Sequence, residues 1–335
     1  MRYFRYIHLL ITSLVLAIDL LGCGSDVRKV SETRELMGTF VEITAYDRSP
    51  SEAKRAIDLA FKEMERIDQL MSTYKRESEV SRLNRDGYLE NPSQELRYVI
   101  EKALYYSRLS DGAFDITVQP ILKLYTHTYK ELGRPPTREE LESAKELVGY
   151  ENIALGRNAI RLNKKGAMIT LGGIAKGYAI DKAIKSLREN GIKSALVNAG
   201  GDIRAIGVKP GGERWHIALR NPRKEREYIT IIYVTDEAVA TSGDYERYFD
   251  QSKKVHHIIN PKTGRSATEL ISVTIVADKA IDADALATTV FVLGPKRGLQ
   301  LIESMDRVEG LLITHDRRII RSSGFKRFER PFRSG

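Results

Sequence analysis

The chain has 335 residues, of which 42% are hydrophobic and 30% are charged, so its composition is that of a globular protein and excludes a disordered one. The net charge of +9 would suit an anionic ligand, a nucleic acid or a membrane surface. Before the tail, however, no long block of lysine and arginine is interleaved with aromatic residues, so we expect no nucleic acid among the partners. We interpret the basic tail FKRFERPFRSG as a solvated chain end.

The beginning of the chain is similar to a bacterial lipoprotein signal. Arg2 and Arg5 make a basic start, and residues 9–18 form an apolar run that is short for a membrane-spanning helix. The lipobox-like sequence LLGC follows and predicts a signal peptide over residues 1–22 and a lipid on Cys23. An ordinary signal peptide or an uncleaved anchor is the alternative. Because Cys23 is the one cysteine, the mature domain would form no disulfide and no cysteine metal site.

The pattern of apolar residues predicts an α+β (mixed α/β) fold. A polar linker over residues 24–33 leads into one domain, which we place at residues 34–325. The predicted strands, from alternating apolar residues, are 39–46, 195–198, 216–220, 228–234, 257–259, 271–277 and 308–314. The predicted helices, from helical spacing, are 50–71, 93–109, 138–148, 176–189, 284–293 and 296–305. We expect central, mostly antiparallel sheets flanked by helices, with a helical insertion in the N-terminal half.

Two glycine-rich segments have the composition of anion-binding turns. LGGIAKG at residues 171–177 opens a predicted helix, where backbone N–H groups and the helix dipole favour a phosphate. LVNAGGDIRAIG at residues 196–207 ends a strand in a glycine pair, which Asp202 and Arg204 follow. An ordinary tight turn explains either segment equally well, because glycine tolerates left-handed backbone.

Acidic and hydroxyl side chains lie inside the apolar segment KAIDADALATTVFVLG. Asp284 and Thr288 are four residues apart, so they share one face of a helix and would supply two hard oxygen ligands for Mg²⁺ or Ca²⁺. We interpret Asp282 as the N-cap of that helix. His256 and His257 are neighbours in a predicted strand, so at most one of them lines a given site, and a structural histidine is the alternative for each. The histidines lack the spacing of a zinc site.

Eight segments of the chain occur together in one order between residues 34 and 314. They are Met37-Gly38-Thr39, MSTYKRESEVSRLN at 71–84, GAFDITVQP at 112–120, LGGIAKGYAID at 171–181, NAGGDIRA at 198–205, TSGDYERYF at 241–249, HHIINPKTG at 256–264 and DADALATTVFVLG at 282–294. In this combination they resemble the FAD:protein FMN transferase family, also called the ApbE family. The resemblance implies a mixed α/β protein that binds FAD and Mg²⁺, transfers FMN to a threonine hydroxyl of a target flavoprotein and releases AMP.

The resemblance also implies two alternatives and a location. Some members hydrolyse FAD to FMN and AMP, and a periplasmic lipoprotein that binds FAD without chemistry would use similar motifs. The expected location is the bacterial periplasm, with a lipid anchor in a membrane, the outer membrane rather than the inner one. The implied acceptors are flavoproteins that face the periplasm, such as subunits of membrane redox complexes.

By motif position, the resemblance assigns roles to individual residues. The flavin-nucleotide contacts fall on Met37, Tyr74, Ala113, Phe114, Asp115, Lys176 and Ile259. The metal ligands fall on Asp284 and Thr288, with the backbone oxygens of Gly173 and Ala287. The chain departs from the family at Thr170 and Asn260, where aspartate is common. Because a threonine hydroxyl needs a proton acceptor when it attacks, we expect His257 in that role, with Asp244 as the rival.

Overall fold

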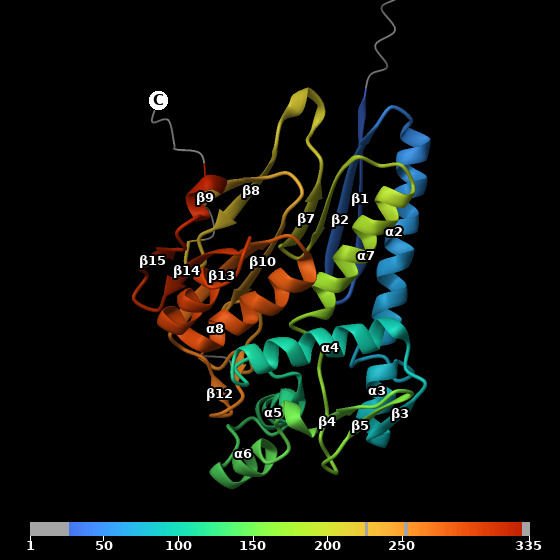
Figure 1. Ribbon diagram of the computed structural model, residues 1–335. Helices are drawn as coiled ribbons and strands as arrows, with labels where there is room; N and C mark the ends of the chain where they lie inside the picture. Colours follow the sequence, from blue (N-terminus) through green and yellow to red (C-terminus); the bar gives the residue numbers. More distant parts are fainter. Residues whose placement is uncertain (1–26, 225–226, 251–253, 330–335) are drawn as a thin grey trace, which may run out of the picture.

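A computed structural model describes residues 27–224, 227–250 and 254–329 (Figure 1). The signal peptide expected at residues 1–22 and the lipidation site Cys23 lie outside the described residues. The centre is one sheet of eight strands in which all neighbours are antiparallel, which confirms the predicted α+β class. In spatial order the strands are β1 (Arg28–Leu36), β2 (Thr39–Asp47), β6 (Ser194–Ala199), β7 (Asp202–Ile206), β10 (Ala238–Gly243), β13 (Leu270–Ala277), β14 (Glu309–Thr314) and β15 (Ile319–Arg321).

Three long helices cover one face of this sheet: α2 (Pro50–Met71), α7 (Ala175–Glu189) and α8 (Ala280–Glu303). The start of α2 was predicted correctly, because the Ser49 hydroxyl accepts a hydrogen bond from the Glu52 N–H and Pro50 occupies the first turn. The break expected between two C-terminal helices is also confirmed. It is a kink inside α8 at Gly294, whose φ of 77° interrupts the helix just before Pro295.

The other face of the sheet is covered by a hairpin of two strands, β8 (Trp215–Arg220) and β9 (Tyr228–Val234). Every second residue of β8 is buried, which is the alternation that predicted this strand. Trp215 and Ile217 pack there with residues of β7, β10, β13 and β14 in a second, smaller core. The sheet is therefore buried on both faces, and the groups that could meet a ligand lie at its ends.

The helical insertion predicted for the N-terminal half lies between α2 and α7 and packs below the main sheet in Figure 1. Its elements are α3 (Glu79–Asp86), β3 (Tyr88–Glu90), α4 (Gln94–Leu109), η1 (Ile116–Val118), α5 (Gln119–Thr126), η2 (His127–Glu131), α6 (Arg138–Lys145), η3 (Tyr150–Asn152), β4 (Ile153–Leu155) and β5 (Ala159–Leu162). The capping box of Thr137 and Glu140 is present as expected. In the described part of the chain, no helix has the length and apolar character needed to cross a membrane.

Three predicted boundaries were wrong. Residues 28–33, assigned to a linker, belong to β1, whose polar sequence reflects its place at the edge of the sheet. The helix expected at 138–148 ends at Lys145. The strand expected at 257–259 is reduced to β11 (Ile259–Asn260), which pairs with β12 (Arg265–Ser266), because the chain before it is held by loop contacts.

The interpretation of Asp282 as an N-cap was also wrong. Helix α8 begins four residues earlier than expected, so Asp282 lies in its first turn, and Lys279 holds the N-cap position without a side-chain capping bond. The Asp282 carboxylate instead accepts hydrogen bonds from Lys102 Nζ at 2.8 Å and Tyr106 Oη at 2.7 Å, both on α4. Asp282 therefore joins the insertion to the main helices.

Helix α8 is capped by a residue from another helix. Asp181 of α7 accepts hydrogen bonds from the backbone N–H groups of Ala280 at 2.9 Å and Ile281 at 3.1 Å. The same carboxylate forms an ion pair with Arg204 of β7, and both side chains are 13% exposed. This single group thus satisfies the open end of α8 and fixes it against α7 and the sheet.

We expect Asp181→Ala to lower the free energy of unfolding by about 3 kcal/mol or more, because Arg204 would keep a buried charge without its partner. Asp181→Asn keeps an acceptor for one N–H group and should cost less. The matched control is Asp236→Ala, which removes an exposed ion pair with Arg188 and should cost less than about 1 kcal/mol. Urea unfolding measures all three variants, and an Asp181→Ala chain as stable as the parent would contradict this account of the cap.

Candidate active site

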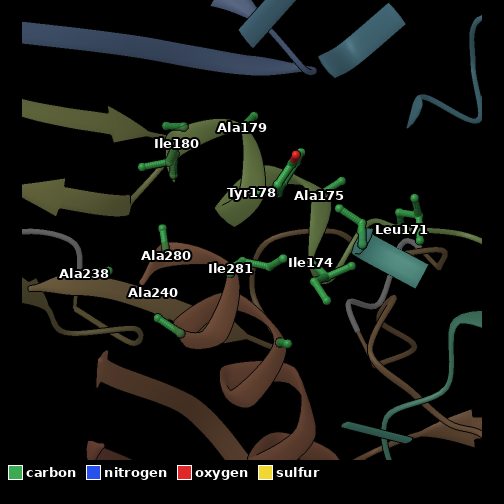
Figure 2. Close-up of a cluster of buried hydrophobic side chains, with 14 of the residues drawn as sticks. Leu171, Ile174, Ala175, Tyr178, Ala179, Ile180, Ala238, Ala240, Ala280 and Ile281 are labelled. Carbon is green, nitrogen blue, oxygen red and sulfur yellow. The ribbon is translucent and has the colours of Figure 1, made fainter. Parts of the chain in front are cut away.

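The candidate site is built where the first turns of α7 and α8 cross. The N–H of Gly177 donates a hydrogen bond to Asp284 Oδ2 at 2.9 Å. A Cβ atom at Gly177 would lie 2.2 Å from the carbonyl oxygen of Ala280, so the helices can approach this closely only over a glycine. Figure 2 shows the apolar side chains that pack beside this crossing, among them Ile174 of the preceding turn and Ile281 of α8.

Two buried carboxylates and a partly exposed ammonium meet beside this crossing. Lys176 Nζ lies 2.9 Å from Asp202 Oδ2, and Asp202 Oδ1 accepts a hydrogen bond from the Thr241 N–H at 3.1 Å. Burial alone would lower the pKa of Lys176, but the charges of Asp202 and Asp284 outweigh that effect and raise it, so the ammonium stays charged. Burial, and after it the charge of Asp202, raise the pKa of Asp284 above its ordinary range. Two carboxylates thus share one ammonium.

Hydroxyl oxygens lie next to these charges. The hydroxyl of Thr288 is 3.2 Å from that of Ser242, at the end of β10. Within the described chain it forms no bond to a carbonyl of its own helix, whereas the hydroxyl of Thr289 donates to the Ala285 carbonyl at 2.7 Å. A Cβ atom at Gly173 would lie 3.1 Å from Thr288 Oγ1, so the glycine turn before α7 faces this hydroxyl. Asp284 and Thr288 both lie in α8, four residues apart and so on one face of the helix.

The buried aspartates Asp115 and Asp284 differ in the number of hydrogen bonds that their carboxylates accept. Asp115 accepts from the Thr117 N–H at 2.8 Å, the Thr117 hydroxyl at 2.6 Å and the Tyr150 N–H at 2.9 Å. Asp284 is only 6% exposed, yet within the described residues it accepts one hydrogen bond, from Gly177. Because a buried carboxylate normally has several partners, Asp284 has unused ligand capacity.

The two adjacent histidines have different surroundings. His256 is buried; its Nε2 lies 2.8 Å from the Ala267 carbonyl, and its Nδ1 accepts from the Ile258 N–H at 3.3 Å. Both ring nitrogens of His256 are therefore used in structural bonds. His257 Nδ1 lies 3.3 Å from the Arg247 carbonyl, an arrangement that places the proton on Nδ1 and leaves Nε2 as an acceptor. Burial, and next the charge of Arg247, lower the pKa of His257 to about 4.

Asp244, the rival proton acceptor, already has a charged partner. Its two carboxylate oxygens lie 2.9 Å and 2.5 Å from the two terminal nitrogens of Arg223, in a bidentate pair. This pair ties the loop that follows β10 to the loop between β8 and β9. Both oxygens of Asp244 are thus engaged, whereas no described residue bonds Nε2 of His257, so the geometry favours His257.

The sequence model of the ApbE family matches residues 37–312. The chain belongs to the ApbE family. A protein of Haemophilus influenzae named FAD:protein FMN transferase is 30% identical over 336 residues, which cover 95% of this chain and 96% of that protein. The crystal structure of the ApbE protein of Thermotoga maritima has a TM-score of 0.82 at 36% identity and covers 90% of this chain and 100% of that one. Flavin transferase ApbE from Vibrio cholerae has a TM-score of 0.77 at 30% identity, with coverage of 90% and 100%.

The residues that ApbE motif positions assign to the flavin nucleotide lie on several elements. Met37 forms the turn between β1 and β2 with a φ of 55°, and Tyr74, between α2 and α3, is 89% exposed. Ala113 and Phe114 are buried in the loop after α4, and the Phe114 ring lies within 3.4 Å of the Cβ position of Gly173. Lys176 lies in the first turn of α7, beside the charges described above.

Ile259 and the two departures from the family pattern have local explanations. Ile259 is buried in a small apolar cluster with residues of α5 and α6. Asn260 accepts a hydrogen bond from the Lys262 N–H at 3.0 Å, which is the turn bond that an aspartate would make. Thr170 accepts from the Gly172 N–H at 3.3 Å and so shapes the glycine turn, but it supplies no charge.

Sequence reasoning missed two groups of the site. Asp202 was noticed only as a part of a possible turn, although it is the ion-pair partner of Lys176. Ser242 was not considered, although its hydroxyl meets that of Thr288. Both residues come directly before or after a turn at the end of a strand, and polar residues at such ends are the signal that could have found them.

Replacing Gly177 by alanine should destabilise the protein by about 1–3 kcal/mol, because the new methyl group must push α8 away from α7. The same displacement should weaken whatever ligand Asp284 binds. Gly156 is the matched control, since a Cβ atom there would meet its nearest neighbour at an ordinary 3.5 Å, and Gly156→Ala should be nearly neutral. Thermal melts compare the two variants, and equal melting temperatures would show that the close crossing is not required.

Proposed function

We propose that this ApbE-family chain transfers FMN from FAD to a threonine hydroxyl of an acceptor flavoprotein and releases AMP. The observation that carries the proposal is the buried Asp284 carboxylate with unused ligand capacity, one helical turn before Thr288, whose hydroxyl faces the glycine turn at Gly173. Such a group of oxygens beside a helix start is suited to a metal-bound diphosphate. The relatives named FAD:protein FMN transferase support the same reaction.

The donor set fits Mg²⁺ rather than a softer metal. In the described residues, no group of three or more histidine, cysteine, aspartate or glutamate side chains forms a metal site. The proposed ligands are the Asp284 carboxylate, the Thr288 hydroxyl and, by motif position, the backbone oxygens of Gly173 and Ala287, all hard oxygens. Mg²⁺ prefers such a partial shell, completed by water or phosphate, and when bound it would neutralise charge on the phosphoryl oxygens.

The protein's own groups then have separate tasks in the transfer. The threonine oxygen of the acceptor forms a bond to the phosphorus of the FMN half, and the bond from this phosphorus to the bridging oxygen breaks, so that AMP leaves with that oxygen. The threonine proton passes to Nε2 of His257, whose tautomer is set by the Arg247 carbonyl. The charged Lys176 stabilises negative charge that builds on the leaving phosphate.

Two alternatives use the same site. In the first, water replaces the threonine hydroxyl, and FAD is hydrolysed to FMN and AMP. In the second, the protein carries FAD without chemistry. The second is disfavoured because binding FAD without chemistry does not require a buried carboxylate with unused ligand capacity beside the diphosphate. Incubating the protein with FAD and Mg²⁺, with and without an acceptor flavoprotein, separates all three: transfer yields AMP and a labelled acceptor, hydrolysis yields AMP alone, and storage yields neither.

Removal of the charged metal ligand should abolish most of the turnover. We expect Asp284→Ala to lower kcat roughly a hundredfold or more, because the cation matters most where charge develops in the transition state. Thr288→Ala removes a neutral ligand and should cost less. Asp282→Asn, two residues away on the same helix, is the control and should keep its turnover. The measurement is AMP release against Mg²⁺ concentration. A folded, fully active Asp284→Ala protein, or a parent whose activity is unchanged by EDTA, would contradict the Mg²⁺ mechanism.

The pH profile should report the lowered pKa of His257. Because that pKa is about 4, the imidazole is neutral and able to accept a proton at pH 5, where an ordinary histidine is mostly charged. Transfer by the parent should therefore persist well below pH 6.5 and fall only toward pH 4. His257→Asn should lower kcat at least about a hundredfold with FAD affinity unchanged. An acid limb centred near pH 6.5 in the parent would argue against His257 as the base.

The proposed place of action is the bacterial periplasm, with the chain attached to a membrane through a lipid on Cys23, the outer membrane rather than the inner one. The basic start, the apolar run and the lipobox-like LLGC support this. Cys23→Ser should remove the lipid and release the protein from membranes. Fractionation of cells that produce each form is the measurement, and a Cys23→Ser protein that stays with the membranes as the parent does would refute the lipid anchor.

A further inference from the structure

The most unusual feature of the site is a single ammonium shared by two buried carboxylates. Lys176 pairs with Asp202, at 2.9 Å, and not with Asp284, although the charge of Asp284 acts on it as well. Asp202 is 3% exposed and Asp284 is 6% exposed, so water solvates neither carboxylate well. The position of the Lys176 ammonium therefore affects the energy of both carboxylates. Of these two carboxylates, Asp202 is the one that forms the ion pair with Lys176.

Asp202 is held more firmly than Lys176. It is the first residue of β7, directly after the glycine pair at residues 200–201, and its second oxygen accepts a hydrogen bond from the Thr241 N–H of β10 at 3.1 Å. Lysine, by contrast, carries its charge on a flexible stem of four carbons. The fixed carboxylate therefore decides where the flexible ammonium lies.

Without Asp202, the ammonium would have one buried carboxylate left beside it, which accepts from the N–H of the residue after Lys176 and acts on the ammonium through its charge. That carboxylate is Asp284, which accepts a single hydrogen bond from the described residues and so has room for another donor. An ion pair between Lys176 and Asp284 would occupy the oxygens that a metal needs. Lysine would then compete with the divalent cation for the same ligand.

We propose that Asp202 is a positioning residue, which holds the Lys176 ammonium off the Asp284 carboxylate and so keeps Asp284 open to a divalent cation. The proposal rests on the metal role given to Asp284 above. It makes Asp202 part of the metal site without contact to the metal. The isosteric change Asp202→Asn keeps the shape of the side chain and the acceptor for Thr241, and removes only the charge that holds Lys176.

A double-mutant cycle tests this, with Mn²⁺ as the probe and free Mn²⁺ measured by electron paramagnetic resonance in the absence of FAD. The four proteins are the parent, Asp202→Asn, Lys176→Met and the double variant. We expect Asp202→Asn to weaken Mn²⁺ binding about tenfold when Lys176 is present. In the Lys176→Met background, the same change should weaken binding no more than about twofold, because no ammonium remains to compete.

The cycle separates positioning from simple attraction. If Asp202 acted only by attracting the cation through space, its removal would cost the same factor in both backgrounds, and the proposal would be wrong. Unchanged binding in Asp202→Asn would overturn it too. Asp284→Ala must abolish Mn²⁺ binding, so that the added Mn²⁺ is measured as free; binding that persists would place the ion elsewhere and also overturn the proposal. Asp236→Asn, at an exposed ion pair, controls for a loss of surface charge.

Stability and catalysis are followed separately. If Asp202→Asn melts too low to be measured, Asp202→Glu keeps the charge but displaces Lys176 by one methylene group, and its Mn²⁺ affinity should fall by a smaller factor; an unchanged affinity would refute positioning.

AMP release from FAD by the parent tests the proposed function independently. A parent that releases AMP without coupling in the cycle defeats this inference alone, whereas coupling without AMP release defeats the transferase and leaves the inference standing.

Discussion

The arrangement of the site depends on the close crossing of α7 and α8. Gly177 permits the approach, and Asp181 holds the start of α8 through its first two N–H groups. This contact brings together two segments that are more than 100 residues apart in the sequence. Four strands of the main sheet, and in addition the β8–β9 hairpin, lie between them along the chain. The glycine turn and the oxygens of Asp284 and Thr288 would not face each other if either helix moved by the width of a methyl group.

The crossing concentrates charge where a protein interior tolerates it poorly. When both are ionised, Asp202 and Asp284 have only the charge of Lys176 between them in the described part of the chain, which leaves the group one positive charge short. Burial of an unbalanced carboxylate costs stability, and selection for stability alone would favour an apolar residue or a second basic one. The deficit is understandable if the missing charge belongs to a bound cation, since the same interaction that destabilises the empty site strengthens binding.

The sequence predicted those parts of the molecule that local rules decide. The capping serine before α2, the capping box of α6 and the break at Gly294 each depend on neighbouring residues and were found correctly. The cap of α8 was assigned to Asp282, two residues into the helix, because the true cap, Asp181, comes from a different helix and leaves no trace near α8. Local patterns carry no record of such a partner.

The same limit applied to the strands and to the site. Strands β7 and β10 were missed because each is short and because polar residues of a motif begin β7 and end β10. That Asp284 and Thr288 share a face of α8 follows from helical periodicity and was foreseen, whereas the ion pair of Asp202 with Lys176 joins a strand to a helix and was not. His256 and His257 each bond one carbonyl oxygen that the fold brings near, from Ala267 and Arg247, and the Ile258 N–H engages the second ring nitrogen of His256.

The length of the edge strand β1 also limits how far from a membrane the site would lie if the chain is lipid-anchored. If Cys23 carries the lipid, five peptide steps separate it from Arg28, a reach of at most about 18 Å. The nine residues of β1 then extend about 30 Å to the turn at Met37, the end of the sheet at which the site lies. The tether would thus confine the reaction to a layer within about 50 Å of the membrane, and an acceptor must present its threonine inside that layer.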